Sequence, residues 1–398
     1  MPALEPFRAL RYDPAKVDPS TVVAPPYDVV GPAERAALAS SSPYNSIWVE
    51  LPQPTGDEDR YGTAAKLFRT WQEEGVLVRD ASPTLYRYRM TYTGRSGDRR
   101  HTTGVVGALG VETPGEGDVL PHEQTLPKAK SDRLDLLRAT KVNTSPIWGL
   151  SLAKGLTELL EIDGPPVFSA TSEGVTHELW VLPPEQVAQV SALVATAPVV
   201  IADGHHRWET ALNYSAETGS KDHAGAGAAM AFVVELVEEE LEVGPIHRLI
   251  SGIEPGGLLE ALGGAFELEP IASGRVEVNE ALVDQAVSAS APIFVDASGA
   301  WLMRALPATE KAASEDLDSA RLAVALKDHP EAKVRFANSA AEVDAALGAG
   351  DATAAVLLRP VTVSQIADVA HARRRMPPKT TFFRPKPRTG MLFRPLEG

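Results

Sequence analysis

Apolar and polar residues alternate along the first part of the chain with the two periods of regular secondary structure. Residues 46–51 and 84–92 alternate large apolar and polar side chains, which predicts two half-buried strands. Between them, residues 61–75 place apolar side chains three and four positions apart and end at a glycine, which predicts an amphipathic helix. The prolines within residues 25–28 predict an extended connector, because proline bars a helix there.

The same patterns continue through the rest of the chain. Ser131 is a suitable N-cap for a helix that reaches Lys141, and an apolar run over 198–202 predicts a buried strand that leads into a helix over 205–218. Further strands are expected over 231–237, 291–296 and 354–358. Strands and helices thus occur throughout, which predicts a mixed α/β fold.

We divide the chain into three segments by these patterns and by composition. Residues 1–119 form an N-terminal mixed α/β segment, residues 120–251 form a core, and residues 252–398 form a C-terminal α/β segment. The last segment ends in a basic tail from Arg373 onward, whose prolines prevent a continuous helix.

Composition narrows the class of protein. The 398 residues include no cysteine, which excludes disulfides and thiolate chemistry. No apolar stretch is long enough to span a bilayer, and the N-terminus does not resemble a signal peptide. The net charge of −15 disfavours broad contact with nucleic acid. We expect a cytoplasmic protein with neither a membrane nor a nucleic-acid partner; the sequence does not determine the oligomeric state.

The clearest chemical signal is the Asp-Gly-His-His-Arg sequence that joins the strand at 198–202 to the helix at 205–218. A glycine at such a turn lets the backbone approach a ligand closely. The unpaired amide groups and the dipole at a helix N-terminus bind anions, phosphate in particular. The candidate phosphate-binding residues are Asp203, Gly204, His205 and Arg207, with His206 beside them.

Two other interpretations of this junction stay open. Asp203 could act only as the N-cap of the helix, with the histidines satisfied by their neighbours. His205 and Glu209 are four residues apart on one helix face, a spacing that zinc ligands use, although the full HExxH motif is absent. Basic side chains at the helix end where the dipole repels them favour an anion-binding role instead.

A second candidate segment covers residues 120–134, where two prolines bracket His122 and Glu123. A carboxylate beside an imidazole on a fixed loop suits a general base or a magnesium ligand. Lys128 and Lys130 follow, where they could hold further phosphate oxygens. Taken alone, the segment is also typical of a solvated charged loop.

Four further residues are weaker candidates. His247 and Arg248 follow a predicted strand and could converge on the same pocket or lie in a surface loop. The tail interleaves basic residues with two phenylalanines, a pattern that can stack on nucleic-acid bases. We favour a tail that packs its phenylalanines on the body of the protein and offers Lys379 and Arg384 to an anion.

Motifs along nearly the whole chain resemble DUF1015, a bacterial family of uncharacterised proteins. The segments that carry the resemblance are Arg11–Pro14, Pro25–Val29, Pro43–Asn45, Pro121–Glu123, Ala202–Arg207 with Glu209–Ala211, and Met376–Thr381. The family name itself implies no function.

A carboxylate-bearing segment followed by strand, DGHHR and helix is also similar, more remotely, to the ParB/sulfiredoxin superfamily. The free L-serine kinases are closest in pattern. This resemblance implies a ParB/sulfiredoxin-like core, ATP or ADP, and Mg²⁺. It implies that Glu123 takes the proton from the substrate hydroxyl and that the turn at 203–207 holds phosphate and Mg²⁺, with Asp203 as the metal ligand. The long interval between the two motifs departs from the pattern and leaves the substrate open.

Our hypothesis from the sequence is therefore a Mg²⁺-dependent phosphotransferase that acts on a small hydroxyl metabolite, with L-serine as the first candidate. The candidate catalytic residues are Glu123, His122 and His206. Three alternatives stay open: a phosphoserine phosphatase-type hydrolase, a nucleotide-gated or nucleic-acid-binding ParB-like module without catalysis, and a metabolite-binding protein without turnover. The sequence determines neither the acceptor, nor the phosphate donor, nor the direction of reaction.

Overall fold

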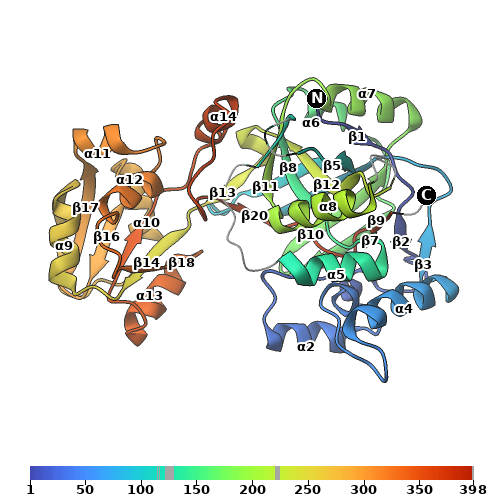
Figure 1. Cartoon of the computed structure of the whole chain (residues 1–398), viewed down its shortest axis with the longest axis horizontal. Helices are drawn as coiled ribbons and strands as arrows, with labels where there is room; N and C mark the ends of the chain where they lie inside the picture. Colours follow the sequence, from blue (N-terminus) through green and yellow to red (C-terminus); the bar gives the residue numbers. More distant parts are fainter. Residues whose placement is uncertain (114, 116, 122–129, 220–224, 397–398) are drawn as a thin grey trace. The chain divides into compact units, whose positions relative to one another are not determined.

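The computed structural model describes residues 1–113, 115, 117–121, 130–219 and 225–396, which fold into two compact units. Unit 1 contains the described residues within 1–121, 130–242 and 385–396, and unit 2 contains residues 243–384. Strands and helices alternate in both units, so the predicted mixed α/β class is confirmed (Figure 1). The division of the sequence at residues 119 and 251 stays a prediction.

Within its described residues, unit 1 is built on a nine-stranded sheet with the strand order β6-β11-β8-β12-β5-β4-β10-β9, and β1 pairs with β5. Neighbouring strands are antiparallel except for the parallel pairs β6–β11 and β8–β12. The strands are β1 (Leu4–Glu5), β4 (Tyr86–Thr93), β5 (Arg99–Gly110), β6 (Val119–Pro121), β8 (Ile147–Ser151), β9 (Phe168–Ser172), β10 (Val175–Val181), β11 (Val199–Asp203) and β12 (Ala228–Glu235).

Helices of unit 1 bury their apolar sides on this sheet and on one another. Trp208 and Ala211 of α8 pack with Val199 and Ile201 of β11 in the main apolar core, which anchors the start of α8 against the strand that precedes it. The helices are α1 (Pro19–Val22), α2 (Pro32–Ser41), α3 (Ile47–Glu50), α4 (Arg60–Glu73), α5 (Lys130–Thr140), α6 (Leu156–Leu159), α7 (Pro184–Val194), α8 (His205–Thr218) and the 3₁₀ turn η2 (Glu238–Glu240). Short strand pairs join β2 (Leu10–Tyr12) to β3 (Leu77–Arg79) and β7 (Val142–Asn143) to β21 (Arg394–Pro395).

Most of the elements expected from periodicity are present. The helix expected over 205–218 is α8, and the helices expected over 61–75 and from Ser131 are α4 and α5. The strand expected over 84–92 is β4, and those expected over 198–202 and 231–237 are β11 and β12. Each of these elements is either long or fully apolar, so its pattern of apolar residues fits one type of secondary structure only.

The strand expected over 46–51 is wrong, because this segment forms the short helix α3. The Asn45 side chain accepts a hydrogen bond from the backbone N–H of Ile47 at 2.9 Å, and the backbone N–H of Glu50 then donates to the Ser46 carbonyl. An asparagine that bonds to the backbone two residues on starts a turn, and a turn prevents an extended strand.

Unit 2 is built on an antiparallel six-stranded sheet with the order β15-β17-β16-β19-β14-β18. Helices cover both of its faces, because α10 and α13 pack into one apolar core and α9 and α12 into another. The strands are β14 (His247–Ser251), β15 (Phe266–Ser273), β16 (Ile293–Asp296), β17 (Gly299–Ala305), β18 (Lys333–Ala337) and β19 (Ala354–Leu357), and a separate pair joins β13 (Glu242–Gly244) to β20 (Phe382–Arg384). The helices are α9 (Pro255–Gly263), α10 (Glu280–Ser288), α11 (Pro307–Ala312), α12 (Asp318–Ala325), α13 (Ala340–Ala349) and α14 (Val363–His371).

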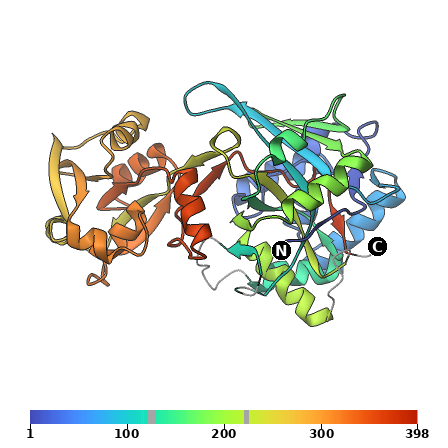
Figure 2. The same ribbon diagram turned by 90° about the horizontal axis from the view of Figure 1, so that it is seen from above.

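The end of the chain returns to unit 1. The backbones of Thr389 and Ala24 bond to each other, as do those of Phe393 and Leu10. Arg394 is fully buried and donates to the carbonyl groups of Ala228 and Gly225. In Figure 2 this red segment lies among the blue and cyan elements of the N-terminal region. The basic tail therefore contributes its last residues to the interior of unit 1.

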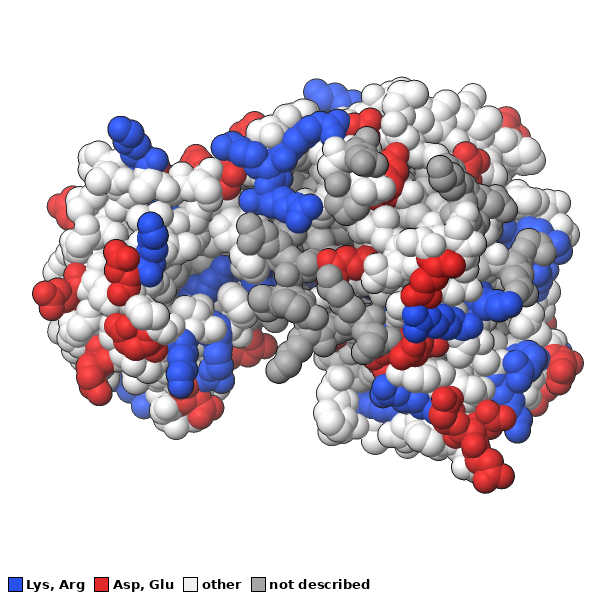
Figure 3. All heavy atoms as spheres, viewed as in Figure 1, with Lys and Arg blue, Asp and Glu red and all other residues white. Residues whose placement is uncertain are grey.

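None of the helices in the described part of the chain has the length and apolar character required to cross a bilayer. The net charge is −15. On the face drawn in Figure 3, acidic and basic side chains are intermixed within each unit.

Candidate functional site

The predicted strand–turn–helix junction is present in unit 1. Strand β11 ends at Asp203, and α8 begins at His205. Gly204 between them has φ +86°, a left-handed conformation that favours glycine. A Cβ atom at this position would lie 3.0 Å from the guanidinium group of Arg207. Position 204 therefore requires glycine for two reasons: the left-handed backbone conformation, and the Arg207 guanidinium group that lies against it.

The N-cap position of α8 is Gly204, and no side chain among the described residues caps this helix end. Asp203 is thus not the N-cap, contrary to the alternative interpretation of the junction. The first backbone N–H groups of α8 have no partner within the helix, and they carry the positive end of its dipole. This end of the helix is a site where an anion would be stabilised.

Asp203 binds two cations instead. Its Oδ2 accepts a hydrogen bond from Arg207 Nη2 at 2.9 Å, and its Oδ1 accepts one from Lys386 Nζ at 2.7 Å. Burial would raise the pKa of Asp203, but Lys386 and Arg207 outweigh it and hold the pKa below its ordinary value. Arg207 also donates to the carbonyl of Pro146, which fixes its guanidinium group.

Lys386 is the residue of this site that the sequence analysis missed. It comes from the C-terminal segment, 183 residues after Asp203, and its Nζ also lies 3.8 Å from a carboxylate oxygen of Asp28. Burial alone would lower the pKa of Lys386. The negative charges of Asp203 and Asp28 outweigh this effect, so the pKa lies above its ordinary value. Lys386 lies just beyond the Met376–Thr381 motif, and that proximity was the one available signal.

Motifs that are far apart in the sequence meet around the start of α8. Asp28 belongs to the Pro25–Val29 motif, and the adjacent Tyr27 ring lies 4.4 Å from the Arg133 guanidinium carbon of α5. Burial raises the pKa of Tyr27 to about 12, so its hydroxyl stays protonated. Asn45 of the Pro43–Asn45 motif starts α3, which ends at Glu50.

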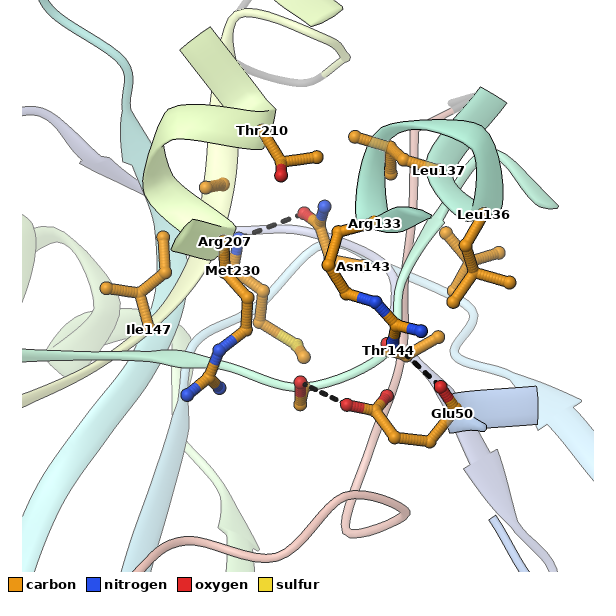
Figure 4. Close-up of a pocket in the computed structure, with 13 residues that line it drawn as sticks. Glu50, Arg133, Leu136, Leu137, Asn143, Thr144, Ile147, Arg207, Thr210 and Met230 are labelled. Carbon is orange, nitrogen blue, oxygen red and sulfur yellow. Dashed lines mark hydrogen bonds between the residues drawn. The ribbon is translucent and has the colours of Figure 1, made fainter. Parts of the chain in front are cut away.

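A cavity of about 40 Å³ opens between α3, α5, β8 and α8 (Figure 4). Glu50 is fully buried there, and Ser145 Oγ donates to its Oε1 at 3.1 Å. Arg133 Nη1 donates to the backbone carbonyl of Glu50 at 2.7 Å. The lining residues are Glu50, Arg133, Leu136, Leu137, Val142, Asn143, Thr144, Ser145, Ile147, Arg207, Thr210, Ala229 and Met230. Arg207 thus joins this cavity to the turn at Gly204.

Unit 2 holds a larger pocket of about 830 Å³, but its chemistry differs. No lysine or arginine is among its lining residues, whereas Glu254, Glu260, Asp328 and Glu331 are. Such a lining repels phosphate, so the larger pocket does not suit a phosphate group.

The remaining sequence candidates fall into three groups. His122, Glu123 and Lys128 lie outside the described residues. Lys130 is the first residue of α5, and only its backbone is described. His205 and His206 stand in the first turn of α8, and a charge on His205 favours ionised Asp203.

The third group is His247, Arg248 and Lys379, which belong to unit 2. His247 and Arg248 are buried in β14 and therefore do not form a surface loop. Arg248 Nη1 donates to the carbonyl of Ile246 at 2.7 Å, and Lys379 has φ +57°. None of the three lines the cavity of unit 1.

The described residues do not fit a magnesium ion directly at Asp203. Each of its carboxylate oxygens already accepts from a cationic side chain. The described part of the chain contains no group of three or more acidic or histidine side chains that could hold a metal ion, which also leaves the zinc interpretation without support there.

The DUF1015 family, described as "Protein of unknown function", matches residues 4–337. The chain belongs to this family. The match covers most of the chain, including the turn at Asp203–Arg207, and confirms the family assigned by the motifs. No curated protein matches the chain.

Several solved structures are similar to this DUF1015 protein. One is a conserved hypothetical protein from Pyrococcus furiosus, at 12% identity and a TM-score of 0.37, covering 67% of this chain and 87% of that one. A free serine kinase in complex with AMP has 12% identity and a TM-score of 0.37, covering 69% and 93%. SbnI from Staphylococcus aureus has 11% identity and a TM-score of 0.37, covering 71% and 84%.

Proposed function

We propose that this DUF1015 protein is a phosphotransferase whose Gly204 turn binds the phosphate groups of a nucleotide, ATP or ADP. The observation that supports it is the uncapped start of α8 beside two cations, Arg207 and Lys386, which share the single carboxylate of Asp203. Backbone N–H groups and two cationic side chains are the donors that phosphate oxygens require.

The turn supplies positioning and charge neutralisation, which carry most of the catalysis in phosphoryl transfer. Arg207 is fixed by Asp203 and Pro146, so its planar donors need little reorganisation when phosphate binds. Lys386 Nζ donates to Asp203 and lies 3.8 Å from Asp28, so it places a second positive charge beside the turn. We assign no step to a metal ion.

Glu123 is the proposed general base that takes the proton from the acceptor hydroxyl, with His122 and His206 as further candidates. The acceptor is a small hydroxyl metabolite. The motif resemblance to the free L-serine kinases makes L-serine and adenine nucleotides the first compounds to test.

The test is phosphorus NMR of the purified protein with Mg²⁺, L-serine and either ATP or ADP, with O-phosphoserine alone in a separate sample. We expect phosphoserine to form. The variant Glu123→Gln should lower kcat by about 100-fold or more, since a positioned base contributes that much. Lys386→Met should lower kcat/KM by about 100-fold, because it removes one charged phosphate ligand.

Two variants on exposed residues of unit 1, Glu161→Gln and Lys154→Met, make the same chemical changes away from the site and should keep wild-type rates. Phosphate release from O-phosphoserine would assign the hydrolase direction to the same site. Nucleotide binding without any product, or rates of Glu123→Gln and Lys386→Met within a few-fold of wild type, would contradict the proposal.

A further inference from the structure

Glu50 is a buried carboxylate that the proposed phosphate site does not use. Its side chain is 0% exposed, and Oε1 accepts one hydrogen bond, from Ser145. None of the described residues bonds to the buried Oε2. A buried acceptor without a partner costs free energy, so its retention requires an explanation.

The other acids around this site differ from Glu50. Asp203 lies 2.7 Å from Lys386, Asp132 lies 2.6 Å from Arg133, and Asp28 lies 3.8 Å from Lys386. Glu50 forms no ion pair with any described residue, although Arg133 and Arg207 line the same cavity. Arg133 is directed to Asp132 and to the backbone carbonyl of Glu50, and Arg207 to Asp203 and Pro146.

The cavity limits what can bind beside Glu50. One water needs about 10–15 Å³ of such space, so the roughly 40 Å³ present takes a group the size of about three waters. A nucleotide base and sugar are far larger. Met230 and Ile147 form apolar parts of the lining, while Glu50, Ser145 and Arg207 provide the polar groups. The space therefore suits a small polar molecule or the end of one.

The charges indicate a protonated amine as its occupant. One carboxylate beside a hydroxyl and two guanidinium groups offers too few oxygen ligands and too much positive charge for a divalent cation. An ammonium group carries a single charge and can donate to Oε2. Arg207 Nε, also buried and without a described partner, matches an acceptor atom on the same molecule.

We propose that this cavity is the acceptor subsite and that Glu50 binds the protonated amine of a small amino-hydroxyl substrate, of the amino acid or amino alcohol class. The inference rests on the proposed phosphotransferase function, since Arg207 connects the subsite to the phosphate-binding turn. In this role, Glu50 makes the protein bind a hydroxyl compound that carries an amine more tightly than a similar compound without one.

The test is calorimetric titration of the full-length protein, with and without ADP, using two pairs of probes. L-serine is compared with 3-hydroxypropionate, which lacks the amine, and ethanolamine with ethylene glycol, which replaces the amine by a hydroxyl. We expect at least one amine to bind ten-fold or more tightly than its partner. Glu50→Gln should remove that preference and leave the weak binding of the amine-free compound unchanged.

The matched control is Glu235→Gln, a buried glutamate of unit 1 whose two oxygens already accept from the backbone N–H groups of Gly155 and Thr157. This variant should keep the preference for amines. Should Glu50→Gln fail to fold, the wild-type comparison of the two pairs still decides. Equal binding within both pairs, or an unchanged preference in folded Glu50→Gln, overturns the proposal.

The two proposals fail differently. Amine selection that depends on Glu50, without any phosphoryl transfer, would keep the subsite and reject the phosphotransferase. Transfer to 3-hydroxypropionate and L-serine with equal kcat/KM would keep the phosphotransferase and reject the role of Glu50.

Discussion

Each unit buries an acidic residue next to arginines, but the two arrangements differ. In unit 2, Asp318 Oδ2 accepts from the backbone N–H and Nε of Arg359, and Oδ1 accepts from Arg359 Nη2 at 2.5 Å. Arg321 lies 3.7 Å from the same carboxylate and also pairs with Glu310. In unit 1, the Glu50 carboxylate accepts one hydrogen bond from the described residues, from Ser145, and lines a cavity.

The difference separates a structural ion-pair network from the proposed acceptor subsite. Every carboxylate oxygen of Asp318 is satisfied within unit 2, and the network requires nothing further. Glu50 keeps one acceptor that no described side chain fills, beside space for a small molecule. An unsatisfied buried polar group next to a cavity is therefore a better guide to function here than a buried charge alone.

The largest expected effect comes from breaking the satisfied network. Asp318→Asn should lower the free energy of unfolding of unit 2 by about 3 kcal/mol, because it leaves two arginines beside an uncharged side chain. Hydrogen exchange measured by mass spectrometry, which reports on each unit, should show faster exchange in unit 2 and unchanged exchange around α8. An unchanged unit 2 would mean that the ion pairs contribute nothing there.

Acid should weaken unit 1 through a buried group that stays neutral. His177 is fully buried against the Tyr88 hydroxyl, and desolvation lowers its pKa to about 3. In the unfolded chain, His177 takes up a proton near pH 6.5. The contribution of the neutral, buried imidazole to the stability of unit 1 is therefore complete above that pH. It falls by about 1.4 kcal/mol for each pH unit between pH 6.5 and 4.5.

The control for this pH dependence is His177→Gln, which cannot titrate. Its unfolding free energy should vary less between pH 6.5 and 4.5 than that of the wild type, in denaturant titrations at both pH values. Parallel pH profiles of the two proteins would show that His177 is not the group responsible.

A smaller effect is expected at the turn. Gly204→Ala places a side chain at φ +86° and within 3.0 Å of Arg207, which should cost about 1–2 kcal/mol of stability and displace the guanidinium group. Nucleotide affinity should fall together with stability. Gly274→Ala, at φ +74° with open space around it, is the matched control and should leave nucleotide affinity unchanged.

The smallest effect on stability is expected at Glu50. Glu50→Gln should change the unfolding free energy by less than about 1 kcal/mol, or raise it, because it removes a buried charge that forms no ion pair with the described residues. Thermal unfolding without ligand measures this change. A loss near that of Asp318→Asn would show that the Glu50 charge has a structural role.

The long elements of this fold could be predicted from the sequence because each has one clear period. The junction at Asp203–Arg207 was also predictable, since its turn, its glycine and its basic first helical turn are contiguous. Helix α3 could not be predicted, because a pattern of four residues fits both a helix and a strand. The hydrogen bond of the Asn45 side chain to the backbone selects the helix.

The α/β class, the DUF1015 membership and the strand–turn–helix junction at Asp203–Arg207 follow from the sequence, because they depend on residues close together in the chain or on extended motifs. Tertiary packing is what brings Lys386 to Asp203 and leaves Glu50 Oε2 without a hydrogen-bond partner among the described residues, beside a cavity. Contacts between residues far apart, and the balance of charges inside a site, depend on how the chain packs. No local period of the sequence encodes that packing.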